Sequence, residues 1–356
     1  MSSLYQNSAT STNVARDPDQ RLACLNEWLA STGLVEVATG RPASVDASFR
    51  RYFRYDVVPA MRDKLGATLV AMDAPPEREN VPAYIHVQGL LFEAGVTVPA
   101  IAARNVEQGF LLLGDLGTTT YLARLSSDNA AFMYSDAVDA LLKFQVTSRP
   151  GVLPEFDRAF VLRELNIFPE WYLNRHLGVT LDDKQQAQLD KVFEAIVANV
   201  LAQQQVFMHR DFHSRNLMFL DQGNPGVLDF QDAVYGPVTY DLASLLRDAY
   251  IQWDEEIVLD WVVRYWQSAK QAGLPVNPDI DAFYRDFEFM ALQRHLKILG
   301  IFCRLNYRDG KAHYMGDLPT VLDYVRKTAN RYTELRPLLR LLDALDDKAP
   351  QVGYTF

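Results

Sequence analysis

The chain has 356 residues, of which 49% are hydrophobic and 22% charged, with 18 Gly and 17 Pro. This length exceeds the usual size of one domain, which excludes a small disulfide-stapled fold and predicts two lobes or one large domain. The composition supplies enough hydrophobic residues for a large core, which excludes wholesale disorder. The 45 acidic and 35 basic residues give a formal net charge of -10, and with no long Lys/Arg block this argues against a nucleic-acid or anionic-membrane partner.

The cysteines and the first residues bear on the compartment. Cys24 and Cys303 are the only cysteines and lie far apart in the sequence, which indicates a reduced compartment. The C-x-x-C spacing of a redox or zinc motif is absent. Residues 1–17 are rich in Ser, Thr and Asn and lack the apolar core of a signal peptide, which predicts a flexible tail. No run approaches the roughly 20 apolar residues of a membrane span. We therefore expect a cytoplasmic protein with no membrane, nucleic-acid or obligate protein partner.

The N-terminal third predicts a small antiparallel sheet crossed by one helix. Leu22, Leu25, Trp28 and Leu29 recur at helical spacing before Gly33, which predicts a helix over 18–32. Aromatic and β-branched residues then indicate strands. The further elements expected are hairpin strands at 49–58 and 67–72, a helix at 82–94, and strands at 96–99 and 109–113.

The rest of the chain has mostly the helical period. Its predicted helices are 128–147, 158–176, 182–204, 240–251, 255–272, 280–304 and 317–345. The exception is 206–232, in which 206–208, 217–220 and 226–230 are short strand-like runs. These patterns together predict an α+β protein, with a sheet-rich first part and a mostly helical second part.

The irregular segment 206–232 carries the strongest chemical signal. It contains His209-Arg210-Asp211 with Asn216 five residues after the aspartate, then a turn and Asp229-Phe230. Phosphoryl transfer from ATP needs one carboxylate that orients the acceptor hydroxyl and takes its proton, and an amide oxygen and a second carboxylate that hold Mg²⁺ at the phosphates. We therefore predict that Asp211 is the catalytic base and that Asn216 and Asp229 bind the metal. Chance spacing and a purely structural polar loop are the alternatives, and the hairpin with its second Asp-Phe argues against both.

These motifs resemble those of the aminoglycoside phosphotransferase/choline kinase-like family, over nearly everything after residue 18. His213, two residues beyond Asp211, is typical of that family, and 236–243 resembles its next motif, in which Asp241 would brace the catalytic loop. The resemblance implies a bilobal protein-kinase-like fold, with a small antiparallel-sheet N-lobe at 18–114 that binds the nucleotide. It also implies a mostly helical C-lobe at 115–356 that holds the catalytic loop, the metal and the acceptor. His209, His213 and Arg215 join Asp211 as implied catalytic residues.

A narrower resemblance concerns the acceptor. Four segments look like those of the bacterial N-acetylmuramate/N-acetylglucosamine anomeric kinases: 46–54, 72–76, 168–172 and 229–233. This resemblance implies an ATP- and Mg²⁺-dependent enzyme that phosphorylates C1 of an amino sugar during peptidoglycan recycling. An aminoglycoside or amino-alcohol kinase is the alternative enzyme, and a non-catalytic ATP-binding regulator is the alternative of another class.

The predicted nucleotide lobe departs from the wider kinase pattern. Met72 stands where a phosphate-binding Lys usually ends the strand, the following helix has no central Glu, and the loop at 44–49 is not rich in glycine. ATP phosphates still need positive charge beyond Mg²⁺. We expect Ser48, Arg50 and Arg51 to contact the phosphates, and Leu113 and Asp115 to lie at the hinge that meets the adenine.

Polar residues on otherwise apolar helices are the candidates for acceptor binding, because a sugar site needs a few polar groups that converge beside an aromatic face. Arg163, Arg294 and Arg304 would suit the lactyl carboxylate of N-acetylmuramic acid. The predicted substrate residues are Arg163, Glu164, Glu170, Gln231, Asp232 and Arg294.

Overall fold

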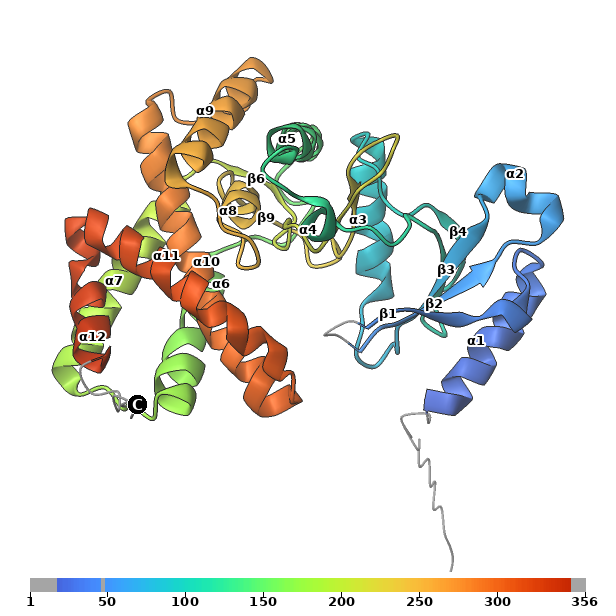
Figure 1. The fold of residues 1–356 in the computed structure, drawn as a ribbon, viewed down its shortest axis with the longest axis horizontal. Helices are drawn as coiled ribbons and strands as arrows, with labels where there is room; N and C mark the ends of the chain where they lie inside the picture. The colour runs from blue at the N-terminus through green and yellow to red at the C-terminus, as the bar shows by residue number, and fades with distance from the viewer. Residues whose placement is uncertain (1–17, 46–48, 347–356) are drawn as a thin grey trace, which may run out of the picture. The chain divides into compact units, whose positions relative to one another are not determined.

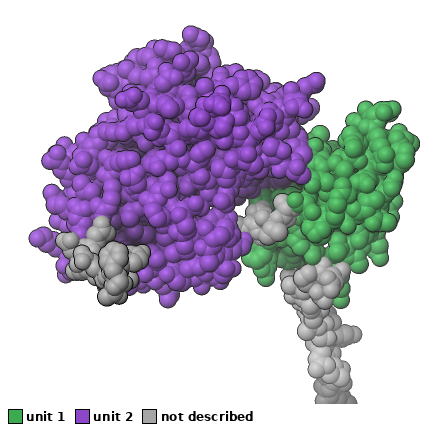
Figure 2. Space-filling view, viewed as in Figure 1, with its two compact units in different colours: residues 1–82, 99–115 green, residues 83–98, 116–356 purple. Residues whose placement is uncertain are grey.

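The computed structural model describes residues 18–45 and 49–346. The predicted tail 1–17 and Ser48 lie outside these residues. The chain divides into two compact units, coloured separately in Figure 2. Unit 1 comprises the described residues up to 82 together with 99–115, and unit 2 comprises 83–98 and the described residues from 116 onward. The predicted lobes at 18–114 and 115–356 differ from this division in the placement of 83–98 and of Asp115, and they stay a prediction.

Unit 1 is a five-stranded antiparallel sheet covered by helix α1 (Figure 1). The strand order is β1-β2-β3-β5-β4. Leu25 and Leu29 of α1 pack with Tyr55, Leu69 and Leu112 of the sheet in one buried cluster, as the helical spacing predicts. The elements are α1 (Pro18–Thr32), β1 (Arg41–Val45), β2 (Arg51–Asp56), α2 (Arg62–Leu65), β3 (Thr68–Asp73), β4 (Ile101–Asn105) and β5 (Phe110–Gly114).

The prediction of a strand at 96–99 is wrong. Residues 96–99 do not join the sheet; Thr97 instead bridges Gly226, and Val96 and Val98 are buried in unit 2. Strand β4 follows at Ile101–Asn105, where Ile101 is the one β-branched residue and the β signal is therefore weak. Strand β1 was likewise not predicted, because Arg41-Pro42-Ala43 carries no strand signal.

Unit 2 is mostly helical. Its helices are the part of α3 (Val81–Glu93) from residue 83, α4 (Tyr121–Arg124), α5 (Ala130–Val146), α6 (Arg158–Leu165), α7 (Asp183–Ala202), α8 (Tyr240–Leu246), α9 (Glu255–Gln271), α10 (Ile280–Asp309), α11 (Leu318–Arg331) and α12 (Arg336–Asp346). Two predicted helices are divided. The 158–176 helix changes to a π-helical segment, Phe168–His176, at Pro169, and the 317–345 helix breaks before Pro337, because proline cannot donate inside a helix.

Four short strands carry the irregular segment of unit 2. Strand β6 (Gln205–Met208) pairs with β9 (Val234–Pro237), and β7 (Leu217–Met218) pairs with β8 (Gly226–Val227), both antiparallel. Strands β6, β7 and β8 match the predicted runs, whereas β9 was missed because Gly236 and Pro237 weaken its strand signal. The chain from His209 to Asn216 therefore spans the interval between two strands, and Asp229 follows directly after the hairpin.

Helix α10 is 30 residues long and packs against Ile167, the residue that precedes the π-helical segment. A Cβ added at Gly300 would lie 2.3 Å from the carbonyl oxygen of Ile167, so only glycine permits this approach. Within the described residues, no helix combines the length and the hydropathy that a membrane span needs.

Candidate active site

The loop after β6 is fixed by a buried carboxylate from α8. Asp241 accepts hydrogen bonds from the backbone N–H groups of His209 (2.7 Å) and Arg210 (2.9 Å). This confirms the bracing role that the sequence resemblance implies. Arg210 has φ of 79°, in the left-handed region that a non-glycine residue adopts at a cost, and the two bonds hold it there.

His209 is a buried positioning group in this loop. Its Nε2 lies 3.0 Å from the carbonyl oxygen of Leu228, and its Nδ1 accepts from the backbone N–H of Asp211 at 3.2 Å. Burial lowers the pKa of His209, against the opposing charges of Asp241, Asp211 and Asp229. Because one ring nitrogen faces an acceptor and the other a donor, the neutral imidazole suits this position and joins the Asp211 loop to the end of the hairpin.

Four of the predicted site residues are joined by hydrogen bonds. Asn216 donates through Nδ2 to the carbonyl oxygen of Asp211 (2.9 Å), and the same nitrogen lies 3.5 Å from Oδ2 of Asp229. Gln231 donates to Oδ1 of Asp229 at 2.9 Å. Asp229 has φ of 61°, again in the left-handed region. The structure thus brings Asp211, Asn216, Asp229 and Gln231 together from two separate stretches of chain.

The Asn216–Asp229 pair has the donor chemistry for a hard cation. Since Nδ2 of Asn216 is engaged with Asp211, Oδ1 is the atom of this side chain that can bind a cation, and Asp229 supplies a carboxylate. Among the described residues, no group of three or more His, Cys, Asp or Glu side chains is arranged as a metal site. Mg²⁺ usually binds one or two carboxylates together with waters and substrate phosphates, so an incomplete protein donor set fits Mg²⁺ that arrives with a nucleotide.

Arg210 is held behind the loop by a buried charge network. Its Nη2 donates to Oε1 of Glu164 at 2.7 Å, and Nζ of Lys297 lies 2.8 Å from the same oxygen. Oε2 of Glu164 accepts from Gln293 at 3.0 Å. Arg294 donates to the backbone carbonyl of Arg210 at 2.6 Å. Glu164 and Arg294, both predicted to bind substrate, thus have protein partners that connect them to the loop.

This network also sets the charge state of Asp211. Burial alone would raise the pKa of Asp211, but the charges of Lys297, His213, Arg210 and Arg294 lower it to about 2. Asp211 is therefore ionised at neutral pH, as a proton acceptor must be.

Aromatic rings flank the far end of the same loop. The guanidinium of Arg215 lies 3.7 Å from the ring centre of Tyr250 and 5.6 Å from that of Tyr314. The ring of His213 meets Tyr250 edge-on at 5.5 Å, and its buried Nδ1 has no hydrogen-bond partner in the described structure. Next to His213, Ser214 is anchored through its N–H and hydroxyl to Asp248.

Three predicted substrate residues are exposed, and of these Asp232 also accepts through its backbone carbonyl oxygen from Arg210 at 3.3 Å. Arg163 stacks on Phe160 at 4.4 Å, and Glu170 lies in the π-helical segment. Asp232 accepts from Gln231 at 3.3 Å and is exposed. Their contact with an acceptor stays a prediction.

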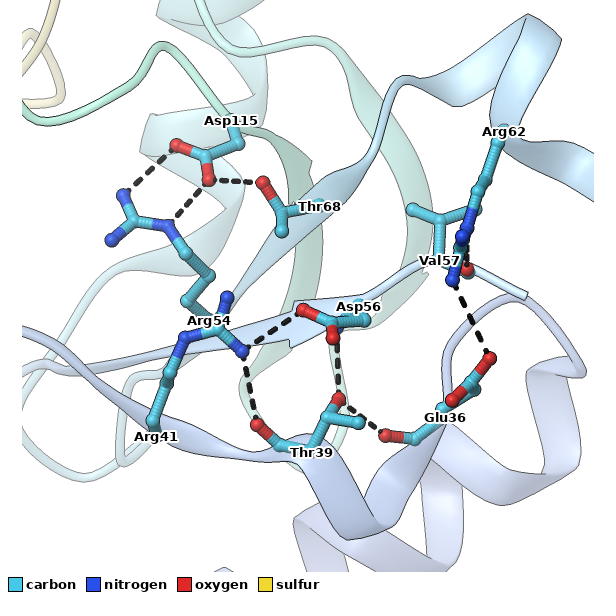
Figure 3. A network of polar contacts seen from close by, with 9 residues as sticks. All are labelled: Glu36, Thr39, Arg41, Arg54, Asp56, Val57, Arg62, Thr68 and Asp115. Atoms are coloured by element: carbon cyan, nitrogen blue, oxygen red, sulfur yellow. Dashed lines mark hydrogen bonds and ion pairs between the residues drawn. The ribbon is translucent and has the colours of Figure 1, made fainter. Parts of the chain in front are cut away.

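In unit 1, the arginines of the predicted phosphate-binding stretch are ion-paired. Arg51 donates from Nε to Asp73 at 2.9 Å, and Nε of Arg50 lies 3.8 Å from Glu79. Arg54 and Thr68 both bind Asp115, the predicted hinge residue (Figure 3).

Leu113 lies within the unit 1 sheet, between Val70 of β3 and Ile101 of β4. The contacts of Arg50, Arg51, Leu113, Asp115 and Ser48 with ATP stay predictions.

Sequence reasoning missed two residues that the structure connects to the loop. Lys297 is buried on α10, and the run Arg294-His295-Leu296-Lys297 in an apolar helix is the signal that points to it. Tyr250 follows α8 and has no sequence signal of its own, because an isolated tyrosine is ordinarily core.

Comparisons with known proteins agree with this geometry. The model of the phosphotransferase enzyme family matches residues 39–275. N-acetylmuramate/N-acetylglucosamine kinase of Neisseria meningitidis serogroup B is 47% identical over 95% of this chain and 100% of its own length. The protein of the same name from Pseudomonas putida is 46% identical over 90% of this chain and 93% of its own length.

A solved structure shows the same architecture. Choline kinase from Cryptosporidium parvum superposes with a TM-score of 0.59, covering 92% of this chain and 100% of that chain at 10% identity. The expected α+β, kinase-like fold is confirmed. The chain belongs to the phosphotransferase enzyme family.

Proposed function

We propose that this enzyme transfers the γ-phosphoryl group of ATP to the anomeric hydroxyl of N-acetylmuramic acid and of N-acetylglucosamine, producing the sugar 1-phosphate. The observation that carries the proposal is the hydrogen-bonded set of Asp211, Asn216 and Asp229. The choice of acceptor follows from the two relatives that are 46–47% identical over most of the chain and bear these sugars in their names. These relatives favour an amino-sugar acceptor over an aminoglycoside or an amino alcohol.

Asp211 performs the proton transfer. Its ionised carboxylate accepts the proton of the sugar hydroxyl as the oxygen attacks phosphorus, which contributes typically 10² to 10⁴ in rate. An anomeric hydroxyl is more acidic than the other ring alcohols and is therefore well matched to a carboxylate base. Asp241 accepts a hydrogen bond from the backbone N–H of Arg210, and Asn216 donates one to the carbonyl oxygen of Asp211, so the backbone is held on either side of this carboxylate.

Asn216 and Asp229 would hold Mg²⁺ through Oδ1 and the carboxylate. The cation supplies charge neutralisation at the phosphate oxygens during transfer. Gln231 keeps the Asp229 carboxylate oriented through its 2.9 Å hydrogen bond. The positive charge that a Lys supplies at the phosphates in other kinases would come from Arg50 and Arg51. We also propose the cytoplasmic location that the sequence predicts.

Replacement of the acceptor hydroxyl tests the proposal. The parent enzyme should consume ATP with N-acetylglucosamine and N-acetylmuramic acid, and should lose this activity with the 1-O-methyl glycoside of N-acetylglucosamine, which keeps every other hydroxyl. Aminoglycosides and choline serve as comparison acceptors. Phosphorylation of the methyl glycoside would show that C1 is not the target, and a preference for aminoglycosides or choline would contradict the acceptor class.

A further inference from the structure

Most basic side chains around the catalytic loop donate hydrogen bonds to other residues of the protein. Lys297 binds Glu164, and Arg210 binds both Glu164 and the carbonyl oxygen of Asp232. Arg294 donates to the carbonyl oxygen of Arg210. Arg215 is different, because its guanidinium makes no hydrogen bond or ion pair with any residue in 18–45 or 49–346.

Aromatic stacking nevertheless holds Arg215 in place. Its guanidinium lies at 3.7 Å over the ring of Tyr250, with Tyr314 at 5.6 Å. These rings are themselves packed through Phe302, whose ring centre is 6.0 Å from Tyr250 and 5.2 Å from Tyr314. A guanidinium that is fixed by stacking keeps its planar fork of N–H donors oriented, and this fork matches the two oxygens of a carboxylate.

The surroundings place this fork close to the reaction. Arg215 is four residues beyond Asp211, and the next residue, Asn216, bonds to the Asp211 backbone at 2.9 Å. The charges of both Arg215 and Asp211 act on the Tyr250 hydroxyl, while burial raises its pKa. Burial raises the pKa of Asp317 and the charge of Arg215 opposes this, but the two residues form no ion pair in the described structure. An anionic group bound at Arg215 would therefore lie near the loop that carries Asp211.

We propose that Arg215 binds the lactyl carboxylate of N-acetylmuramic acid and makes the enzyme favour this acidic sugar over N-acetylglucosamine, which has no carboxylate. This inference rests on the proposed function. A carboxylate on an organic substituent fits the site better than a phosphate, because the aromatic rings beside the fork offer faces for a sugar or lactyl group. The other arginines suggested for this role are less suited. Arg294 is engaged, Arg163 is exposed on Phe160, and Arg304 lies near Arg308, Asp309 and Glu170.

The test compares kcat/KM for the two sugars in the parent enzyme, in Arg215→Met and in Arg215→Lys. The ratio of kcat/KM for N-acetylmuramic acid to that for N-acetylglucosamine should fall about tenfold or more in Arg215→Met, since a hydrogen-bonded charge is lost. Arg215→Lys, which keeps charge without the fork, should give an intermediate ratio. Arg285→Met is the matched control. Arg285 also lies over two aromatic rings, Phe289 and Tyr332, but its fork binds Glu334, so the ratio should stay within about twofold of the parent.

A second arm keeps the test independent of the variants' folding. The parent should use N-acetylmuramic acid about tenfold better than its neutral carboxamide, and Arg215→Met should not distinguish the two. An unchanged sugar ratio, or an equal loss on both sugars with a raised KM for ATP, would overturn the proposal, and the latter would assign Arg215 to the phosphates. A parent that phosphorylates neither sugar would contradict the proposed function itself and remove the carboxylate site with it.

Discussion

Lys297 and Glu164 are paired behind the catalytic loop, with Nζ 2.8 Å from Oε1. The same oxygen accepts from Arg210 at 2.7 Å, so one buried carboxylate joins α6 and α10 to the residue that precedes Asp211. The sequence suggested that Glu164 contacts the sugar. Its three protein partners instead favour a role in positioning Arg210.

Glu164→Gln distinguishes these two roles. We expect kcat to fall by about 10- to 100-fold with KM for the sugar within about twofold of the parent, because a displaced loop misaligns Asp211 without removing a sugar contact. Steady-state kinetics on variants shown to be folded measures both constants. A tenfold rise in sugar KM at unchanged kcat would restore Glu164 to the substrate site. Glu194→Gln, which breaks an exposed ion pair with Arg158, is the control and should change neither constant.

The stability of the same variant should depend on pH. Burial alone would raise the pKa of Glu164, but Lys297 and Arg210 lower it from 4.5 to about 2. A lowered pKa in the folded state stabilises the protein above the unfolded-state pKa, and this contribution disappears as the pH falls through about 2. The difference in unfolding free energy between the parent and Glu164→Gln should therefore contain a part of about 3 kcal/mol at pH 7 that shrinks between pH 5 and pH 2. Denaturant titrations at several pH values measure it, and a difference that grows toward acid pH would contradict the assignment.

The loop chemistry was predictable from sequence because its residues are close in the chain. Asp211 and Asn216 are five residues apart, and Asp229 follows one short hairpin, so local spacing fixes which side chains meet. Lys297 lies on α10, far beyond Asp211 and Glu164 in the sequence, and only the packing of α10 brings it to Glu164. The misplaced strand at 96–99 has the same origin. Its apolar residues are buried, as a strand's would be, but their partners come from the β7–β8 hairpin, which sequence periodicity cannot identify.

Asp229→Ala tests the metal pair. We expect Mg²⁺ to add no thermal stabilisation to the ATP complex of this variant, because a hard cation loses its carboxylate ligand next to the phosphates. Thermal unfolding with ATP, with and without Mg²⁺, gives the answer. Asp221→Ala removes an exposed carboxylate in the nearby hairpin turn and should retain the Mg²⁺-dependent shift. An Mg²⁺-dependent shift that persists in Asp229→Ala would place the metal elsewhere.

Gly300→Ala tests the approach of α10 to Ile167. The new methyl group would lie 2.3 Å from the Ile167 carbonyl oxygen, which is backbone and cannot rotate away, so the variant should lose about 1–3 kcal/mol of unfolding free energy. Gly89→Ala in α3 is the matched control. No heavy atom lies within 4 Å of its added Cβ, and alanine favours a helix, so this variant should be as stable as the parent or more so. Equal effects of the two substitutions would contradict the close contact.

The central claim is that Asp211 takes the proton of the acceptor hydroxyl. Asp211→Asn keeps the shape of the side chain and its backbone bonds to Asn216 and His213, but removes the base. Single-turnover transfer from Mg·ATP to N-acetylglucosamine is the direct measurement, with ATP binding followed in the same samples. The account predicts transfer at least about 10² slower with ATP binding retained, and transfer at a rate near that of the parent would contradict it.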